Sequence, residues 1–246
     1  MGALPLLALL VIWHVVAKSG IYSAVLLPAP GEVLQAFISQ PEELWKHTQA
    51  SLARVLFGVS LATVTAVPLG LLIGRYRVLD QLSDWTVQMF RSFPSISLIP
   101  LAILFFGIGD KPAVILIWLA AFWPLLINTI FGVKNVERTL LKVAQSASAS
   151  EALLLRDVLL PSAMPYILTG LRLAVGAGWL TVVVAEMMAV KSGLGYLITY
   201  AQTVFKPELI IAGILIIGVI GLTLDQILRV VRRRLCRWQE GLVIDT

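Results

Sequence analysis

Long apolar runs alternate with short polar segments along the chain. Crossing a hydrocarbon core of about 30 Å takes roughly 20 helical residues, and runs of that kind lie at about 3–22, 52–74, 85–107, 112–133, 167–190 and 209–230. The pattern predicts an all-α integral membrane protein with six transmembrane helices in a single domain, 1–246. The first run lacks a basic lead and an A-x-A cleavage site, so we expect a retained helix there and not a removed signal peptide.

Composition supports this class. Hydrophobic residues make up 59% of the chain and charged residues 13%, which is too few charges to cover a soluble domain of this size. The single cysteine, Cys236, cannot form an internal disulfide. With only His14 and His47 beside it, we expect no metal centre.

The distribution of basic residues predicts the orientation. With both termini in the cytoplasm, eleven basic residues lie inside and five outside, as the positive-inside rule favours. The inner set is Arg75, Arg77, Lys134, Arg138, Lys142, Arg156, Arg229, Arg232, Arg233, Arg234 and Arg237; the outer set is Lys18, Lys46, Lys111, Lys191 and Lys206. The arginines at 232–234 follow a span and are typical of a stop-transfer anchor that contacts anionic lipid, and not of a nucleic-acid site.

Two longer polar segments separate the spans. The outer segment, 23–50, contains Pro28, Pro30 and Gly31, which should break any helix, and then a stretch around Glu42–His47 that could be an amphipathic external helix. The inner segment, 134–165, is rich in helix formers. It predicts a helix, a turn at Ser148 and Ser150, and a second short helix that ends at Pro161 and Pro165 before the chain re-enters the membrane.

The third span is predicted to be broken, because Pro94 and Pro100 remove backbone donors within it. Broken spans often mark substrate sites in transporters. A guanidinium and three hydroxyl groups could hold an oxyanion there; these belong to Arg91, Ser92, Ser95 and Ser97. The alternative is that Arg91 pairs with Glu186 or Asp84 as a structural lock.

The fifth span carries two opposite charges on one face. Arg172 and Glu186 lie fourteen residues apart, which places them about 40° apart around the helix and about 21 Å apart along it. Gly176, Trp179 and Val183 lie between them. We expect this face to line a subunit interface or a translocation path. Alternatively, Arg172 reaches the cytoplasmic interface and Glu186 is a buried hydrogen-bonding group.

Several motifs carry a resemblance to a known family. The family's cytoplasmic signature is E-A-A, three residues, G, nine residues, I-x-L-P. Here it aligns as Lys142-Val143-Ala144, Ser148 and Val158-Leu159-Leu160-Pro161, with Lys in place of Glu and Ser in place of Gly. Further similar stretches are Leu27–Pro30, Ser51–Val55, Pro68–Gly74, Pro100–Ile103, Phe106–Gly109, Tyr166–Arg172, Ala185–Met187 and Gly193–Tyr196. Over nearly its whole length the chain resembles the permease subunits of ABC importers of the nitrate, taurine, alkanesulfonate and bicarbonate type.

The resemblance implies a type I ABC importer transmembrane domain in the cytoplasmic (inner) membrane, which translocates a small anion. Its partners would be a second copy of the chain, two ATPase subunits that bind ATP and Mg, and an extracytoplasmic substrate-binding protein. The segment from Lys142 to Arg156 corresponds to the coupling helix that contacts the ATPase. The positions carried over are Lys142, Val143, Ala144, Ala147, Ser148, Ala149, Leu153, Leu154, Arg156 and Pro161. The chain has no G-x-x-x-x-G-K-[ST] loop of its own, so we expect no ATPase site in it.

Two other functional classes fit parts of the sequence. A G-x-G-D sequence at Gly107–Asp110 is typical of intramembrane aspartyl proteases, but no second aspartate lies in a preceding helix to share the site. An ion-coupled secondary transporter could use Glu186 and Asp225 as coupling sites. The segment 134–165 favours the ATP-driven class, because an ion-driven carrier has no use for a docking helix.

Overall fold

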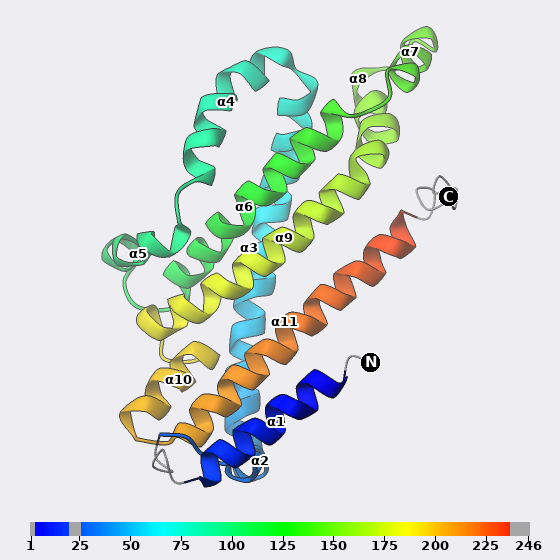
Figure 1. Ribbon diagram of the computed structural model, residues 1–246. Helices are drawn as coiled ribbons and strands as arrows, with labels where there is room; N and C mark the ends of the chain where they lie inside the picture. The colour runs from blue at the N-terminus through cyan, green and yellow to red at the C-terminus, as the bar shows by residue number, and fades with distance from the viewer. Residues whose placement is uncertain (1–2, 20–25, 237–246) are drawn as a thin grey trace.

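The computed structural model describes residues 3–19 and 26–236, and every regular element in those residues is a helix (Figure 1). In chain order they are α1 (Ala3–Lys18), α2 (Pro30–Ser39), α3 (Pro41–Arg75), α4 (Arg77–Arg91), η1 (Ser95–Leu98), α5 (Ile99–Phe106), α6 (Asp110–Lys134), α7 (Arg138–Ser146), α8 (Glu151–Leu153), η2 (Leu154–Leu159), α9 (Leu160–Ala189), α10 (Leu194–Thr203) and α11 (Pro207–Leu235). The all-α fold predicted from the sequence is confirmed.

The core lies between α3, α6 and α9, which run side by side, with α11 along the outer side of α9 (Figure 1). Glycines allow the close approach. A Cβ at Gly70 or Gly74 would lie 2.7 Å from the Cβ of Thr129 or Val133 on α6, and one at Gly170 of α9 would lie 2.7 Å from a side chain of α6. Small residues at such positions let helix backbones pack closely in a membrane, as the spacing of Gly70 and Gly74 suggests.

Four helices of the described chain are long and apolar enough to cross a membrane: α3, α6, α11 and the continuous run Glu151–Ala189. They coincide with the predicted spans at 52–74, 112–133, 209–230 and 167–190. The separate external helix expected around Glu42–His47 is wrong, because these residues form the first turns of α3. Pro30 does not break a helix either. It stands at the start of α2, where its missing N–H group is not needed.

The third predicted span, 85–107, is not one helix. α4 ends at Arg91, and η1 with α5 continues at an angle of 81° to it. Pro94 precedes η1, and Pro100 occupies the first turn of α5. The break expected from the two prolines is confirmed, and α4 with η1 and α5 counts as at most one bent span.

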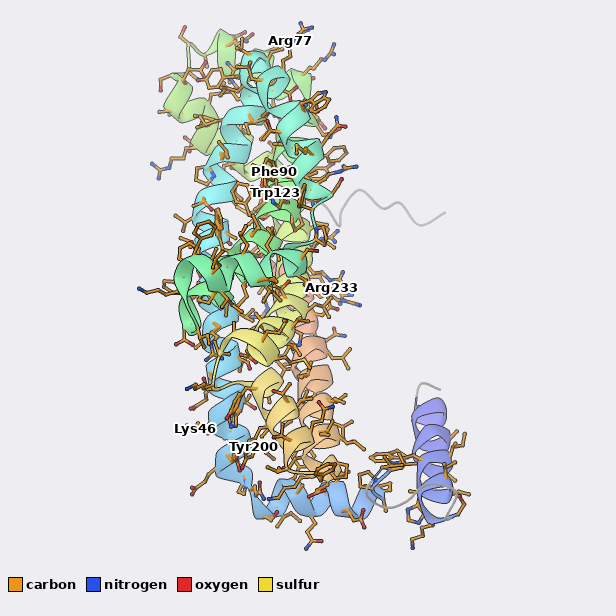
Figure 2. All side chains as sticks on the ribbon, turned by 90° about the vertical axis from the view of Figure 1, so that its left-hand side faces the viewer. Lys46, Arg77, Phe90, Trp123, Tyr200 and Arg233 are labelled. Atoms are coloured by element: carbon orange, nitrogen blue, oxygen red, sulfur yellow. The ribbon has the colours of Figure 1, made fainter. Side chains whose placement is uncertain are left out.

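The first predicted span, 3–22, is only partly described. α1 has 16 residues, which extend about 24 Å and fall short of a core of about 30 Å. It lies apart from the long helices in Figure 2 and is tied to the segment before α2 by a hydrogen bond from Trp13 Nε1 to the oxygen of Pro28 (3.1 Å). The count of six spans therefore stays a prediction. The helix α10, between the last two spans, was not predicted.

The inner segment, 134–165, forms the expected helix, turn and helix. α7 is followed by a turn at 147–150 and then by α8, η2 and α9. The second helix does not end at Pro161 and Pro165, as the sequence suggested. Pro161 lies in the first turn of α9, directly after the π-helical turn η2, and Pro165 lies inside α9. The wider π-helical turn changes the backbone hydrogen-bonding pattern just before Pro161, which has no N–H group to donate.

Candidate functional site

A buried polar network joins α3, α6 and α9 near the end of the molecule opposite α7. Arg54 of α3 is its centre. Its Nη1 donates to Oε1 of Glu186 (2.6 Å) and to the backbone oxygen of Ser192 (2.9 Å), while its Nε donates to Oδ1 of Asp110 (2.8 Å). The side chain of Arg54 is 7% exposed and that of Glu186 is fully buried, whereas Asp110 is 73% exposed.

Backbone groups complete the shell around Glu186. Its Oε2 accepts from the hydroxyl of Ser51 (2.8 Å) and from the backbone N–H of Gly195 (3.0 Å). His47 Nδ1 accepts from the N–H of Gly193 (2.9 Å). A Cβ at Gly193 would lie only 2.2–2.4 Å from the carboxylate of Glu186, and its φ of +107° also favours glycine. The network therefore tolerates only glycine at position 193.

These contacts bind Glu186 within the chain. Every nitrogen of the Arg54 guanidinium already faces a carboxylate or Ser192, so the group has no donor left for a solute. These contacts match the alternative of a buried hydrogen-bonding carboxylate, and a place for Glu186 on the substrate path stays a prediction. Sequence reasoning assigned no role to Arg54. The available signal was an arginine near the start of an apolar span, since such a charge requires a buried partner.

The other charged residue of the fifth span is also paired within the chain. Arg172 of α9 forms an ion pair with Asp225 of α11, in which Nη2 lies 3.1 Å from Oδ2. Asp225 also accepts from Arg229. Trp179 is buried, and its Nε1 donates to the oxygen of Ile217 (3.1 Å). Arg172 and Trp179, two of the residues predicted to line the pathway, thus lie against α11. This helix covers much of the face of α9 that was expected to line a path or a subunit interface.

Arg91 lies in a different environment. It lines a groove of about 430 Å³ between α4 and α6, where the polar face of α4 meets Ile127, Ile130 and Phe131. Two other charges of this groove are paired, because Nζ of Lys134 lies 2.6 Å from Oδ1 of Asp80. Phe90 stacks on Trp123 at 5.5 Å between ring centroids, which holds this end of α4 against α6 (Figure 2).

The predicted lock at Arg91 is not formed. Glu186 pairs with Arg54, and Asp84 accepts from Gln88 (3.1 Å); across the described residues Arg91 has no ion pair or hydrogen bond through its side chain. The three serines do not converge on it. Ser92 donates to the oxygen of Gln88 (3.2 Å), and Ser95 and Ser97 lie in η1 beyond the bend. Of the four predicted oxyanion ligands, only Arg91 lines the groove.

The coupling segment projects at the end of the molecule that carries α7 and α8 (Figure 1). Lys142, Val143 and Ala147 are exposed, Ala149 is half-buried, and Ala144 is buried against the core. Ser148 is exposed and has a φ of +53°. It therefore adopts the left-handed conformation that glycine favours, at the position where the family signature has glycine.

The second half of the segment divides into buried and exposed residues. Leu154 is 7% exposed and belongs to the core cluster, whereas Leu153 is 51% exposed. Of these two leucines, both predicted to belong to the ATPase contact, Leu154 is thus buried within the chain and Leu153 lies on the surface. Arg156 has a side chain that is 87% exposed, and Pro161 is also exposed.

Comparison with known proteins agrees with this architecture. Residues 66–237 match the family described as "Binding-protein-dependent transport system inner membrane component". The chain is 36% identical to the taurine transport system permease protein TauC of Escherichia coli (strain K12) over 95% of its own length and 87% of that protein. It is 35% identical to the putative aliphatic sulfonates transport permease protein SsuC of Bacillus subtilis (strain 168) over 98% of this chain and 88% of that one.

A solved structure has the same fold. The inward-facing MetNI methionine ABC transporter superposes with a TM-score of 0.61 at 18% identity, covering 74% of this chain and 93% of the matched chain. The matched proteins are ABC transporter permeases, which sets aside the ion-coupled carrier. The protein is a multi-pass inner-membrane transport protein, and it belongs to the binding-protein-dependent transport system inner membrane component family, the permease subunits of ABC importers.

Proposed function

We propose that this chain is the permease half of an ATP-driven importer for a small anion of the sulfonate class. The observation that carries the proposal is the exposed helix–turn–helix of 138–153 on a chain of this family. A short exposed element that continues directly into a spanning helix can pass a rigid-body movement into the membrane. The ATP and Mg would be bound by two separate ATPase subunits, since the chain lacks a phosphate-binding loop of the G-x-x-x-x-G-K-[ST] type.

The ATPase contact is proposed on the exposed side of the coupling segment. Val143 and Leu153, which are 62% and 51% exposed, are apolar side chains that a groove on a partner could receive. Lys142 and Arg156 add positive charge beside them. This end of the molecule would face the cytoplasm together with both termini.

A second copy of the chain would complete the path. α4 has no buried residue, and its apolar face is strongly exposed, with Leu82 at 72% and Trp85 at 81%. Leu104 and Phe105 of α5 are 78% and 71% exposed. Apolar residues at membrane depth need lipid or protein as neighbours. We assign the surface formed by α4 and α5 to the second copy and to lipid, and the delivery of solute to an extracytoplasmic binding protein.

The proposed solute contact is Arg91. Relatives of this chain include a taurine permease and a putative aliphatic sulfonates permease, and a guanidinium suits the oxygens of a sulfonate. Arg91 lines a groove and has no carboxylate partner of its own. The carboxylate of Asp84 in the same groove would disfavour an anion unless Arg91 offsets it.

The test is reconstitution of the chain with the ATPase and binding proteins that copurify with it in mild detergent. We expect ATP-dependent uptake of radiolabelled taurine into liposomes, with competition by alkanesulfonates exceeding competition by nitrate or bicarbonate. Arg91→Gln should remove uptake without loss of assembly, and Arg91→Lys should retain part of it. A chain recovered without any ATPase, with uptake that follows a proton gradient, would refute the proposal.

A further inference from the structure

An ion pair connects the coupling segment to α3, a spanning helix to which the segment is not directly joined along the chain. Arg75 is the last residue of α3, and Glu151 is the first residue of α8, directly after the turn that contains Ser148. Nη2 of Arg75 lies 2.8 Å from Oε1 of Glu151. The two residues are 76 positions apart in the chain, so the contact joins separate elements and does not belong to one helix.

This contact has no counterpart elsewhere in the segment. The segment 138–159 is joined covalently to α6 through residues 135–137 and continues into α9, and its backbone hydrogen bonds are local. Among the hydrogen bonds and ion pairs of residues 3–19 and 26–236, only Arg75–Glu151 joins this segment to a spanning helix other than α9. The other ion pair of the segment, Arg156 with Asp157, joins neighbouring residues.

Stability does not account for the contact. The side chains of Arg75 and Glu151 are 32% and 55% exposed, and ion pairs of this exposure contribute little to folding. Nε of Arg75 is buried and has no hydrogen-bond partner, which is unfavourable. The Arg75 guanidinium lies 5.6 Å from the ring centroid of Tyr76. The arginine is therefore held at the end of α3 although one of its donors stays unsatisfied.

We propose that the Arg75–Glu151 pair is a strut that makes α3 move together with the coupling segment. The inference rests on the proposed ATP-driven function and assigns two positioning residues for it. Without the strut, a displacement of α7 and α8 would reach the membrane through α6 and α9, to which the segment is covalently joined, and the π-helical turn at Leu154–Leu159 could absorb part of the movement toward α9 by bending. With the strut, α3 receives the displacement together with α6 and α9.

The test reverses each charge alone and then both together. Arg75→Glu and Glu151→Arg, made in the full reconstituted complex, should each lower the solute transported per ATP hydrolysed by about fivefold or more, while the ATPase still copurifies. The exchange of both charges, R75E/E151R, should restore most of this ratio. Glu151→Gln keeps the side-chain shape and should give an intermediate loss, which covers the case in which a charge reversal fails to fold.

The control is Arg77→Glu, because Arg77 lies at the same end of the molecule (Figure 2), is exposed, and has no ion pair among the described side chains. It should leave the ratio unchanged. Single variants that keep the wild-type ratio would overturn the strut, and so would an exchanged pair that stays as uncoupled as the single variants. Absence of ATP-dependent uptake by the wild-type complex would instead overturn the proposed function itself.

Discussion

The buried network around Glu186 gives the most stringent prediction. The Arg54 guanidinium binds two carboxylates there, of which Glu186 is fully buried and Asp110 is mostly exposed. Glu186→Gln keeps the size of the side chain but supplies an NH₂ group. Whichever way the amide is turned, its NH₂ group faces either Arg54 Nη1, which donates at 2.6 Å, or the N–H of Gly195 and the hydroxyl of Ser51. Two donors then oppose each other in a site that excludes water, and we expect a marked loss of stability.

The magnitude follows from the burial of the pair. Breaking a fully buried ion pair costs about 3–5 kcal/mol, and the lower end applies because Arg54 keeps Asp110 as a partner. Asp110→Asn is the matched control. It removes a carboxylate from the same guanidinium, but Asp110 is 73% exposed, so its loss should cost about 0–1 kcal/mol.

Thermal unfolding of the purified chain in detergent, followed by circular dichroism, measures the difference. For a chain of this size about 1 kcal/mol corresponds to a shift of roughly 2–4 °C in Tm. Glu186→Gln should therefore lower Tm by roughly 6–12 °C, and Asp110→Asn by at most roughly 4 °C. Equal shifts for the two variants, or an unchanged Tm for Glu186→Gln, would refute the reasoning that burial determines the strength of this pair.

Three further predictions concern single positions. Ser148→Gly should stabilise the chain by about 0.5–1 kcal/mol in chemical unfolding, because it relieves a left-handed residue; a loss of stability would contradict the assigned conformation. Gly193→Ala should lower Tm strongly, since its Cβ would meet the carboxylate of Glu186. Gly176→Ala is the control, because its Cβ would meet no atom within 4 Å, and it should leave Tm unchanged or raise it. Similar Tm values for the two variants would refute the clash. Leu154→Asp should unfold the chain or abolish its expression, because Leu154 is in the core. The Leu153→Asp variant should stay folded and reduce copurification of the ATPase, because Leu153 is exposed. Full copurification with Leu153→Asp would count against an apolar contact at this residue.

The sequence predicted the helical fold well because hydrophobic length is a local property. Spans at 112–133 and 209–230 lie within a few residues of α6 and α11. Errors arose where a helix continues beyond the apolar run. α3 begins at Pro41, well before the predicted start at 52, and the run Glu151–Ala189 passes through Pro161 and Pro165. A helix outside the hydrocarbon core needs no apolar run, so hydropathy does not mark its end.

The candidate sites were predicted less completely, and the reason is distance along the chain. The turn at Ser148 is encoded by neighbouring residues and was found. The partners of Glu186 were not, because Arg54 lies 132 residues away and no local pattern links them. The sequence identified Arg172 and Glu186 as charges on a face expected to line a subunit interface or a path, and it did not identify Asp225 or Arg54 as their partners. The structure pairs both within the chain, whereas Arg91 lines a groove and has no ion pair among the described side chains.

The two charged contacts that join α3 to the run Glu151–Ala189 lie at opposite ends of that run. Glu151 begins this run and Glu186 lies in its last turn, about 52 Å away along the helix axis. Glu151 binds the end of α3, and Glu186 binds Arg54 in the first half of the same α3. α3 and α9 are thus fixed to each other by charge at both ends, with α6 packed against both. On the proposed mechanism a displacement of the coupling turn moves α3, α6 and α9 as one unit. α4 is held against α6 by the Lys134–Asp80 ion pair and by the stacking of Phe90 on Trp123, so Arg91 moves with this unit.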